Sequence, residues 1–174
     1  GTLGKLLLQA RRLCEAGSGY VTIHASYAGV WDMHADQNNL NMRDGMEAVG
    51  YSFDHAVAAF IEDCEARGLS DKIMLVCCGE MGRTPKLNER GGRDHWARLA
   101  PLMIYGGGID GGQVIGKSDR LGGEPITDAY NPRHLISSIL RTVIDPGQLR
   151  LIPNAPQEIL ELLDHPPIAG IGLS

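Results

Sequence analysis

Apolar residues recur at helical spacing in three stretches of the chain. The first covers residues 3–15 and stops just before a glycine pair. The second covers residues 44–67, where phenylalanine, valine, isoleucine and cysteine would form the buried stripe, and it also ends at a glycine. The third covers residues 132–143. We therefore predict three amphipathic helices over these ranges.

Three further stretches have the pattern of β-strands. Residues 20–25 (YVTIHA) are rich in β-branched side chains, and residues 72–78 (KIMLVCC) and 99–105 are apolar almost throughout. A continuous apolar run is typical of a strand buried on both faces of a parallel sheet. The order of elements predicts an α/β fold with a layered, mostly parallel sheet flanked by helices. Because three strands make a thin sheet, we expect this fold to be incomplete and completed by a missing part of the polypeptide or by a partner.

The length of 174 residues and the hydrophobic content of 43% fit a single domain with its own core. Residues 146–174 form a Pro-rich tail, in which we predict one short helix near residues 156–163. A chain that opens on Gly1 without methionine is expected to be a shortened or processed form. Residues 1–17 lack the apolar region and cleavage site of a signal peptide.

Composition argues against several classes of protein. The net charge is −5, from 16 basic and 21 acidic residues, and no basic stripe suggests binding to nucleic acid. No apolar run approaches the roughly 20 residues of a membrane span. The cysteines show no C-x-x-C spacing, which favours four buried thiols over a disulfide framework or a metal site; they are Cys14, Cys64, Cys77 and Cys78.

Two glycine-rich motifs match nucleotide-binding patterns but lack the structural context of such sites. Residues 111–118 (GGQVIGKS) fit the P-loop pattern, and residues 106–111 (GGGIDG) fit G-x-G-x-x-G after a strand. Either site requires a helix to begin at the motif, whereas residues 119–125 (DRLGGEP) cannot form the interior of a helix. We predict hairpin or coil over residues 111–123 and no binding of ATP or GTP.

Residues of the types that bind metals gather in two long loops, at 26–41 and 79–98. The first loop holds a D-x-H pair, and the second holds a glutamate at the end of a strand and an Asp-His pair; these candidate metal ligands are Asp32, His34, Glu80, Asp94 and His95. Open α/β sheets place ligands at the carboxyl ends of their strands, where such loops lie. Oxygen and nitrogen donors suit a divalent ion, with zinc favoured and calcium, magnesium or manganese as alternatives.

An ion held there would polarise a sulfate or phosphate ester and stabilise the charge that develops during its transfer. Arg83 and Arg93 lie beside the candidate ligands and would bind the substrate anion. His95 reaches the same rim of the sheet only if the following strand runs antiparallel to its neighbours or the loop before it folds back.

Each candidate ligand also has a structural alternative. The D-x-H pair could be a turn residue followed by a solvated histidine, Glu80 could pair with Arg83, and Asp94 could cap a turn. His95 could pack under Trp96. Only the joint placement of all these residues in two neighbouring loops raises the metal hypothesis above these alternatives.

Four histidines lie outside the two clusters. His24, in a predicted strand, is expected to be a core or lining residue, and His134, in the first turn of a helix, is expected to have a structural role. His55 is expected to be exposed on its helix, and His165 is not expected to be a ligand.

Three runs carry a resemblance to a known family: GVWDMH (29–34), GEMGRTP (79–85) and GRDHW (92–96). Over residues 5–145 the chain strongly resembles the family catalogued as domain of unknown function 1501. That family is similar to a sulfatase-like branch of the alkaline-phosphatase superfamily. The resemblance implies that this chain is the C-terminal portion of a longer bacterial, exported or periplasmic protein with an alkaline-phosphatase-like fold.

The same resemblance implies roles for individual residues. Asp32 and His34 match the superfamily's Asp/His pair for one metal, and His95 matches the later histidine that completes it. Glu80 stands where relatives have the aspartate of a strand-end D-H-G, a ligand of a second metal, but Met81 follows it in place of histidine. The nucleophile of the superfamily lies in the missing N-terminal half.

These observations leave three hypotheses. The first is a fragment of a metal-dependent hydrolase of sulfate or phosphate esters, acting on a small-molecule or glycan ester and inactive without the N-terminal part of the same protein. The second is a non-catalytic binding or scaffold protein that retains the alkaline-phosphatase-like fold, which the missing histidine beside Glu80 favours. The third, an intramolecular phosphotransferase, has no specific support.

Overall fold

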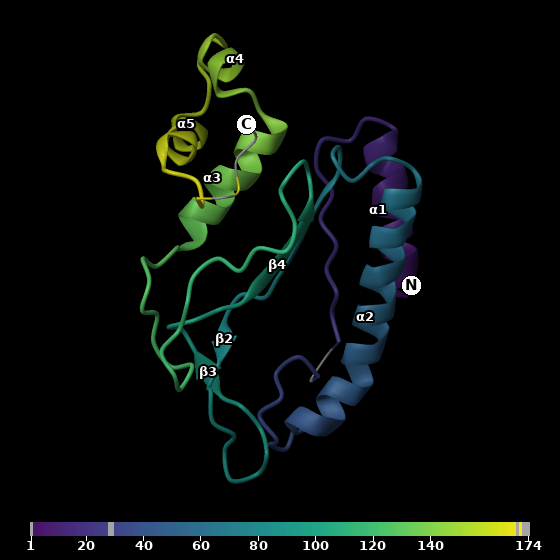
Figure 1. Cartoon of the computed structure of the whole chain (residues 1–174), viewed down its shortest axis with the longest axis vertical. Coiled ribbons are helices and arrows are strands. Elements are labelled where there is room, and N and C mark those ends of the chain that lie inside the picture. The colour runs from purple at the N-terminus through teal and green to yellow at the C-terminus, as the bar shows by residue number, and fades with distance from the viewer. Residues whose placement is uncertain (1, 28–29, 170, 172–174) are drawn as a thin grey trace.

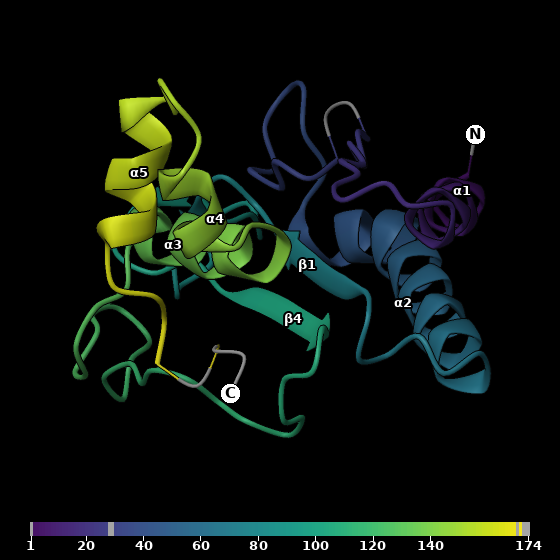
Figure 2. The same cartoon turned by 90° about the horizontal axis from the view of Figure 1, so that it is seen from above.

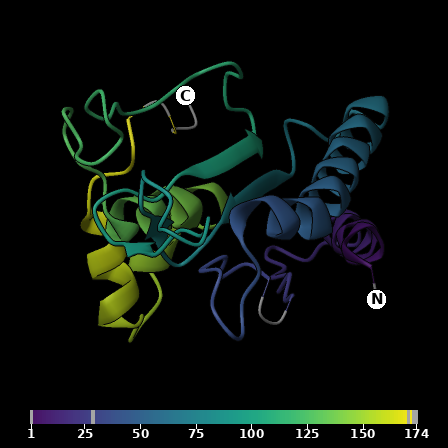
Figure 3. The same cartoon turned by 90° about the horizontal axis from the view of Figure 1, so that it is seen from below.

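A computed structural model describes residues 2–27, 30–169 and 171. Its elements, in chain order, are α1 (Leu3–Glu15), α2 (Met42–Ala66), β1 (Met74–Cys78), β2 (Gly82–Arg83), β3 (His95–Trp96), β4 (Leu102–Gly106), α3 (Pro132–Val143), α4 (Pro146–Arg150) and α5 (Gln157–Asp164). Helices α1 and α2 lie side by side on one side of the molecule, and α3, α4 and α5 gather on the other, with β1 and β4 between the two groups (Figure 1, Figure 2 and, from below, Figure 3).

The three predicted helices are confirmed, and side chains that cap their first turns explain where they begin. The side chain of Thr2 accepts a hydrogen bond from the Lys5 amide ahead of α1, and that of Asn41 accepts one from the Asp44 amide ahead of α2. Helix α3 begins with a capping box, in which the His134 ring accepts a hydrogen bond from the backbone of Asn131. This contact is the structural role predicted for His134.

The sheet differs from the prediction. Two of the predicted strands form β1 and β4 and pair with each other, but they are antiparallel, with Val76 opposite Ile104. The predicted, mostly parallel sheet is therefore wrong for these strands. Residues 79–101 connect them without a helix, and parallel neighbours would require a crossover connection. The described part of the chain is α/β, with two small sheets of two antiparallel strands each.

Residues 20–25 do not form the predicted strand. Their backbone makes no hydrogen bond to another strand within the described part of the chain, and the Ala25 carbonyl instead accepts one from the Trp31 indole at 2.6 Å. The apolar side chains of the segment still serve the core, because Ile23 and Ala25 pack against it. His24, predicted to be a core or lining residue, is exposed. The pattern thus identified the buried face of this segment but not its pairing.

The core lies between the helix pair and one face of β1. It contains Leu3 and Leu7 from α1, Val57 and Phe60 from α2, and Ile73 just before β1. The prediction that this strand is buried on both faces is wrong, because no residue of β1 is fully buried. The opposite face of the β1–β4 pair is formed by Met74, Val76, Ile104, Cys78 and Leu102, of which the last two are exposed.

The cysteines are free thiols, as predicted, but they are not all buried. Cys64 is fully buried in α2, whereas Cys78 at the end of β1 is exposed and Cys14 and Cys77 are half-buried. Burial raises the pKa of the Cys77 thiol. Nothing in their placement brings a cysteine into the candidate metal site.

The segment that matches the P-loop pattern contains no helix, as predicted. Residues 117–126 form a hairpin, closed by a bridge between Ser118 and Pro125 and by the hydrogen bond from the Asp119 amide to the Glu124 carbonyl. The tail contains the predicted short helix as α5 and also α4, which the sequence pattern did not indicate. None of the described helices combines the length and the hydropathy that a membrane span requires.

Candidate metal centre

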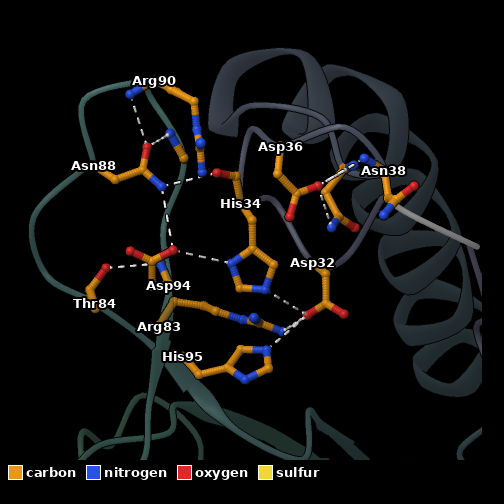
Figure 4. A network of polar contacts seen from close by, with 12 residues as sticks. Asp32, His34, Asp36, Asn38, Arg83, Thr84, Asn88, Arg90, Asp94 and His95 are labelled. Atoms are coloured by element: carbon orange, nitrogen blue, oxygen red, sulfur yellow. Dashed lines mark hydrogen bonds and ion pairs between the residues drawn. The ribbon is translucent and has the colours of Figure 1, made fainter.

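The loop that carries Asp32 and His34 is anchored to α2 by the residue before Asp32 and by the residue between Asp32 and His34. Trp31 packs edge-on against Phe53 of α2, with ring centroids 6.3 Å apart. Met33 is buried, 5% exposed, and its side chain lies against Gly45 at the start of α2. Because Trp31 and Met33 bind the loop to the helix, Asp32 and His34 turn toward the second loop, as Figure 4 shows.

The second loop folds back on itself as a hairpin made of β2 and β3. Gly82 pairs with Trp96, and Arg83 pairs with His95. The hairpin places the Arg83 and His95 side chains next to each other and returns the chain to the rim where β1 ends. Both conditions set for His95 to reach that rim are therefore met: the loop folds back, and the strand after it, β4, runs antiparallel to β1.

Backbone contacts hold the hairpin against the first loop. The Arg93 amide donates to the Met33 carbonyl at 2.8 Å, and the Asn88 side chain donates to the His34 carbonyl at 2.9 Å. Gly92 lies so close to this loop that an added Cβ would come within 2.3 Å of the His34 carbonyl oxygen. These contacts fix the backbones of the two loops relative to each other, next to the residues whose side chains form the site.

Three of the five predicted metal ligands converge. One ligand atom from each of Asp32, His34 and His95 lies within 4.8 Å of the others, which makes these residues a candidate metal-binding group in the described part of the chain. The Asp32 Oδ1 atom lies 3.8 Å from the His34 Nε2 atom and 3.3 Å from the His95 Nε2 atom. The side chains of Asp32 and His95 are about half exposed, at 48% and 51%, so the cluster is open to solvent.

These separations fit a single bound ion. Ligand atoms about 2.1 Å from a tetrahedral zinc ion lie about 3.4 Å from one another. The two Asp32–histidine separations, 3.8 and 3.3 Å, lie close to this value, and the ligand atoms of the two histidines lie within 4.8 Å of each other. Two imidazoles and one carboxylate are also the donor set of many catalytic zinc sites, which leave the fourth position to water or substrate.

Arg83 adds a permanent positive charge to the cluster. Its NH2 group donates to Asp32 Oδ1 at 2.5 Å and lies 3.6 Å from Glu80 Oε1. This hydrogen bond, with a smaller contribution from His95, holds the pKa of the Asp32 carboxyl below its usual value, although partial burial opposes the shift. Asp32 is therefore ionised throughout the neutral pH range, as a metal ligand must be. The NH1 group of Arg83 is buried and has no hydrogen-bond partner among the described residues.

The remaining predicted site residues lie around this cluster. Glu80 is strongly exposed and is outside the convergent group, and it makes the contact with Arg83 that was the structural alternative to its predicted role as a metal ligand. Asp94 contacts His34 from the side away from Asp32, at 3.4 Å from the Nδ1 atom. Arg93 donates through its NH1 group to the carbonyls of residues 84 and 85, so it braces the hairpin, and its role in binding substrate stays a prediction.

Sequence reasoning missed the residues that hold the two loops together. Asn88 also accepts hydrogen bonds from the amides of Arg90 and Gly92, which closes the tip of the hairpin. The Thr84 hydroxyl accepts from the Asp94 amide and donates to the Lys86 carbonyl. The Asn-x-x-Gly-Gly run at 88–92 is a turn signal that could have indicated the hairpin, but no pattern indicates its contact with His34.

The comparison with family models decides which family this is. The model described as "Protein of unknown function (DUF1501)" matches residues 1–157, which is most of the chain. This chain belongs to the DUF1501 family. No curated protein and no solved structure matches it. The matched residues include both loops of the candidate metal centre and all the described strands. Asp32, His34 and His95 therefore lie in the part of the chain that the DUF1501 model matches.

Proposed function

We propose that this DUF1501 chain is the metal-bearing portion of a divalent-metal-dependent hydrolase of sulfate or phosphate esters. The observation that carries the proposal is the convergence of Asp32, His34 and His95 at spacings that suit one ion. Zinc is the metal that this donor set favours, because two imidazoles and a carboxylate match its preferred ligands. When bound, such an ion polarises the ester and stabilises the negative charge that develops on its oxygens.

The residues around the ion supply binding and orientation. Asp32, His34 and His95 would hold the metal and leave an open position, since the cluster faces solvent. Arg83 lies against the same carboxylate and offers a planar guanidinium, whose paired N–H groups suit sulfate and phosphate oxygens. A substrate anion at the open position would therefore meet positive charge from the metal and from Arg83 together.

The surface of the chain supports the proposal that it is the C-terminal portion of a larger, alkaline-phosphatase-like domain. Its accessible surface is 11781 Å², whereas a compact monomer of 18.8 kDa exposes about 8,300 Å². Part of this excess comes from the face of the β1–β4 sheet opposite the core, where Cys78 and Leu102 are exposed. Additional strands or helices from the same polypeptide would cover that face and complete a layered sheet.

Among the described residues, no activated nucleophile lies beside the candidate metal centre. Of the aliphatic hydroxyls in the two loops, that of Thr84 accepts from the Asp94 amide and donates to the Lys86 carbonyl, and that of Ser26 is exposed and makes no hydrogen bond with another described residue. Metal-assisted transfer through a covalent intermediate requires an activated nucleophile that faces the ion. We therefore place the nucleophile in a part of the protein outside this chain.

The activity of a longer protein that includes this chain tests the proposal. The 174-residue chain alone should show no turnover of aryl sulfates or aryl phosphates, whereas the longer protein should hydrolyse one of these classes. This activity should disappear with a chelator and return with zinc. Asp32→Ala should abolish it, because the ion loses its only carboxylate among the three convergent ligands. The matched control, Asp71→Ala beside β1, should leave it unchanged.

A longer protein that binds zinc at this cluster but hydrolyses no sulfate or phosphate ester in a broad panel would favour a non-catalytic binding or scaffold protein. One observation already points that way. Glu80, the residue at the end of β1, is exposed and pairs with Arg83, and Met81 follows it where a second metal site would require a histidine. Such a protein would retain the metal site and the fold but would not catalyse the hydrolysis.

A further inference from the structure

The two nitrogens of the His34 ring face two different carboxylates. The Nε2 atom lies 3.8 Å from Asp32 Oδ1, inside the cluster, and the Nδ1 atom lies 3.4 Å from Asp94 Oδ1, outside it. Figure 4 shows the ring between these two side chains. The His34 side chain is 19% exposed and is the least exposed of the three convergent ligands. A ring held in this way can offer only one nitrogen to an ion that Asp32 and His95 share.

Asp94 is itself held in place. Its amide donates to the Thr84 hydroxyl at 3.1 Å, and its carbonyl accepts from the Thr84 amide at 2.9 Å. The Asn88 side chain lies 3.4 Å from Asp94 Oδ1, and the same Nδ2 atom donates to the His34 carbonyl. One amide group therefore links the carboxylate of Asp94 to the backbone of the histidine that it faces.

We infer that Asp94 is a positioning residue that sets the tautomer and the orientation of His34, and is not itself a metal ligand. This inference rests on the proposed metal site. A carboxylate at Nδ1 favours the tautomer that carries its proton there, which leaves the Nε2 lone pair free toward Asp32 and His95. Metal-binding histidines commonly have such a carboxylate partner on the other ring nitrogen, and its loss weakens metal binding about 10- to 100-fold.

The tautomer can be measured in the metal-free chain, without any assay of activity. Two-bond ¹⁵N–¹H spectra of the histidine rings, recorded where imidazoles are neutral, should show His34 protonated at Nδ1. In Asp94→Ala, His34 should change to the form protonated at Nε2, which is the more stable one for a histidine side chain free in solution. In Asp94→Asn, the side-chain oxygen can still accept the Nδ1 proton, so the original tautomer should persist.

Zinc affinity, measured by competition with a chromogenic chelator, gives a second readout. Asp94→Ala should bind zinc about 10- to 100-fold more weakly than the unmodified chain, and Asp94→Asn should lose less. The matched control is Asp36→Ala. Asp36 is an exposed carboxylate in the loop that carries His34, close enough for its charge to interact with that ring, but its Oδ1 atom accepts hydrogen bonds from Asn38 and Asn39. This control should retain both the tautomer and the affinity.

A His34 ring that stays protonated at Nδ1 in Asp94→Ala would overturn the inference, and so would equal losses of zinc affinity in the Ala and Asn variants. Circular dichroism should show that each variant is folded, and the backbone contacts of Asp94 with Thr84 do not depend on its side chain. Failure of the proposed metal site, on which the proposed function depends, has a different signature. In that case the unmodified chain binds no zinc, while the tautomer still responds to Asp94.

Discussion

Gly82→Ala should disrupt the β2–β3 hairpin and with it the candidate metal centre. An added Cβ at this position would lie 1.5 Å from the Leu99 carbonyl oxygen and 2.8 Å from that of Trp96. Both obstacles are backbone atoms, so no side-chain rotation can relieve the overlap, and the backbone of β2 must move away from Trp96 in β3 and from Leu99 beyond it. We expect a loss of about 3 kcal/mol in the free energy of unfolding, measured by denaturant titration, at the upper end of the range for overpacked sites.

Zinc binding should be lost together with the hairpin, since Gly82 precedes Arg83 and pairs opposite Trp96, next to His95. The control variants are Gly19→Ala and Gly111→Ala, where an added Cβ meets no atom within 4 Å. Both should retain their stability within about 0.5 kcal/mol, as surface substitutions usually do. A Gly82→Ala protein as stable as these controls would contradict the close approach of Gly82 to the backbones of Leu99 and Trp96.

His95→Ala should lower the affinity for zinc by at least about 100-fold, because one of three protein ligands is removed from an open site. The change should cost little stability, since the side chain is 51% exposed and makes its polar contact with Asp32 alone among the described residues. Competition with a chromogenic chelator measures the affinity, and thermal unfolding without metal measures the stability.

His55→Ala is the matched control, because His55 is an exposed histidine of α2 that stacks on Tyr51. It should bind zinc as the unmodified chain does. Equal affinity in His95→Ala and His55→Ala would exclude His95 as a ligand and reduce the cluster to a polar contact between the two loops.

The helices and the candidate site were predictable from the sequence for different reasons. Helix periodicity is local, so residues 3–15 and 132–143 could be assigned to their ends, and α2 to within two residues. The three convergent ligands could be proposed because a D-x-H pair and a later histidine lie in two long loops. The distances between these three ligands could not be predicted, because they depend on the hairpin folding back over the first loop.

The sheet was less predictable because strand pairing depends on residues far apart in the sequence. The apolar run at 72–78 is compatible with a strand buried on both faces, but its burial is set by what covers it. The segment 20–25 has the composition of a strand and contributes to the core, yet it makes no ladder in the described chain. The contact of Gly92 with the His34 backbone is a close approach that no residue pattern predicts.

The central claim is that Asp32, His34 and His95 hold one metal ion, and the position of zinc in the loaded protein tests it most directly. Anomalous diffraction at the zinc edge should show a single strong peak within about 2.2 Å of one atom from each of these three side chains. X-ray absorption spectra of the same sample should require two imidazole nitrogens and a carboxylate oxygen in the first coordination sphere. A zinc peak elsewhere on the chain, or spectra without imidazole, would contradict the claim.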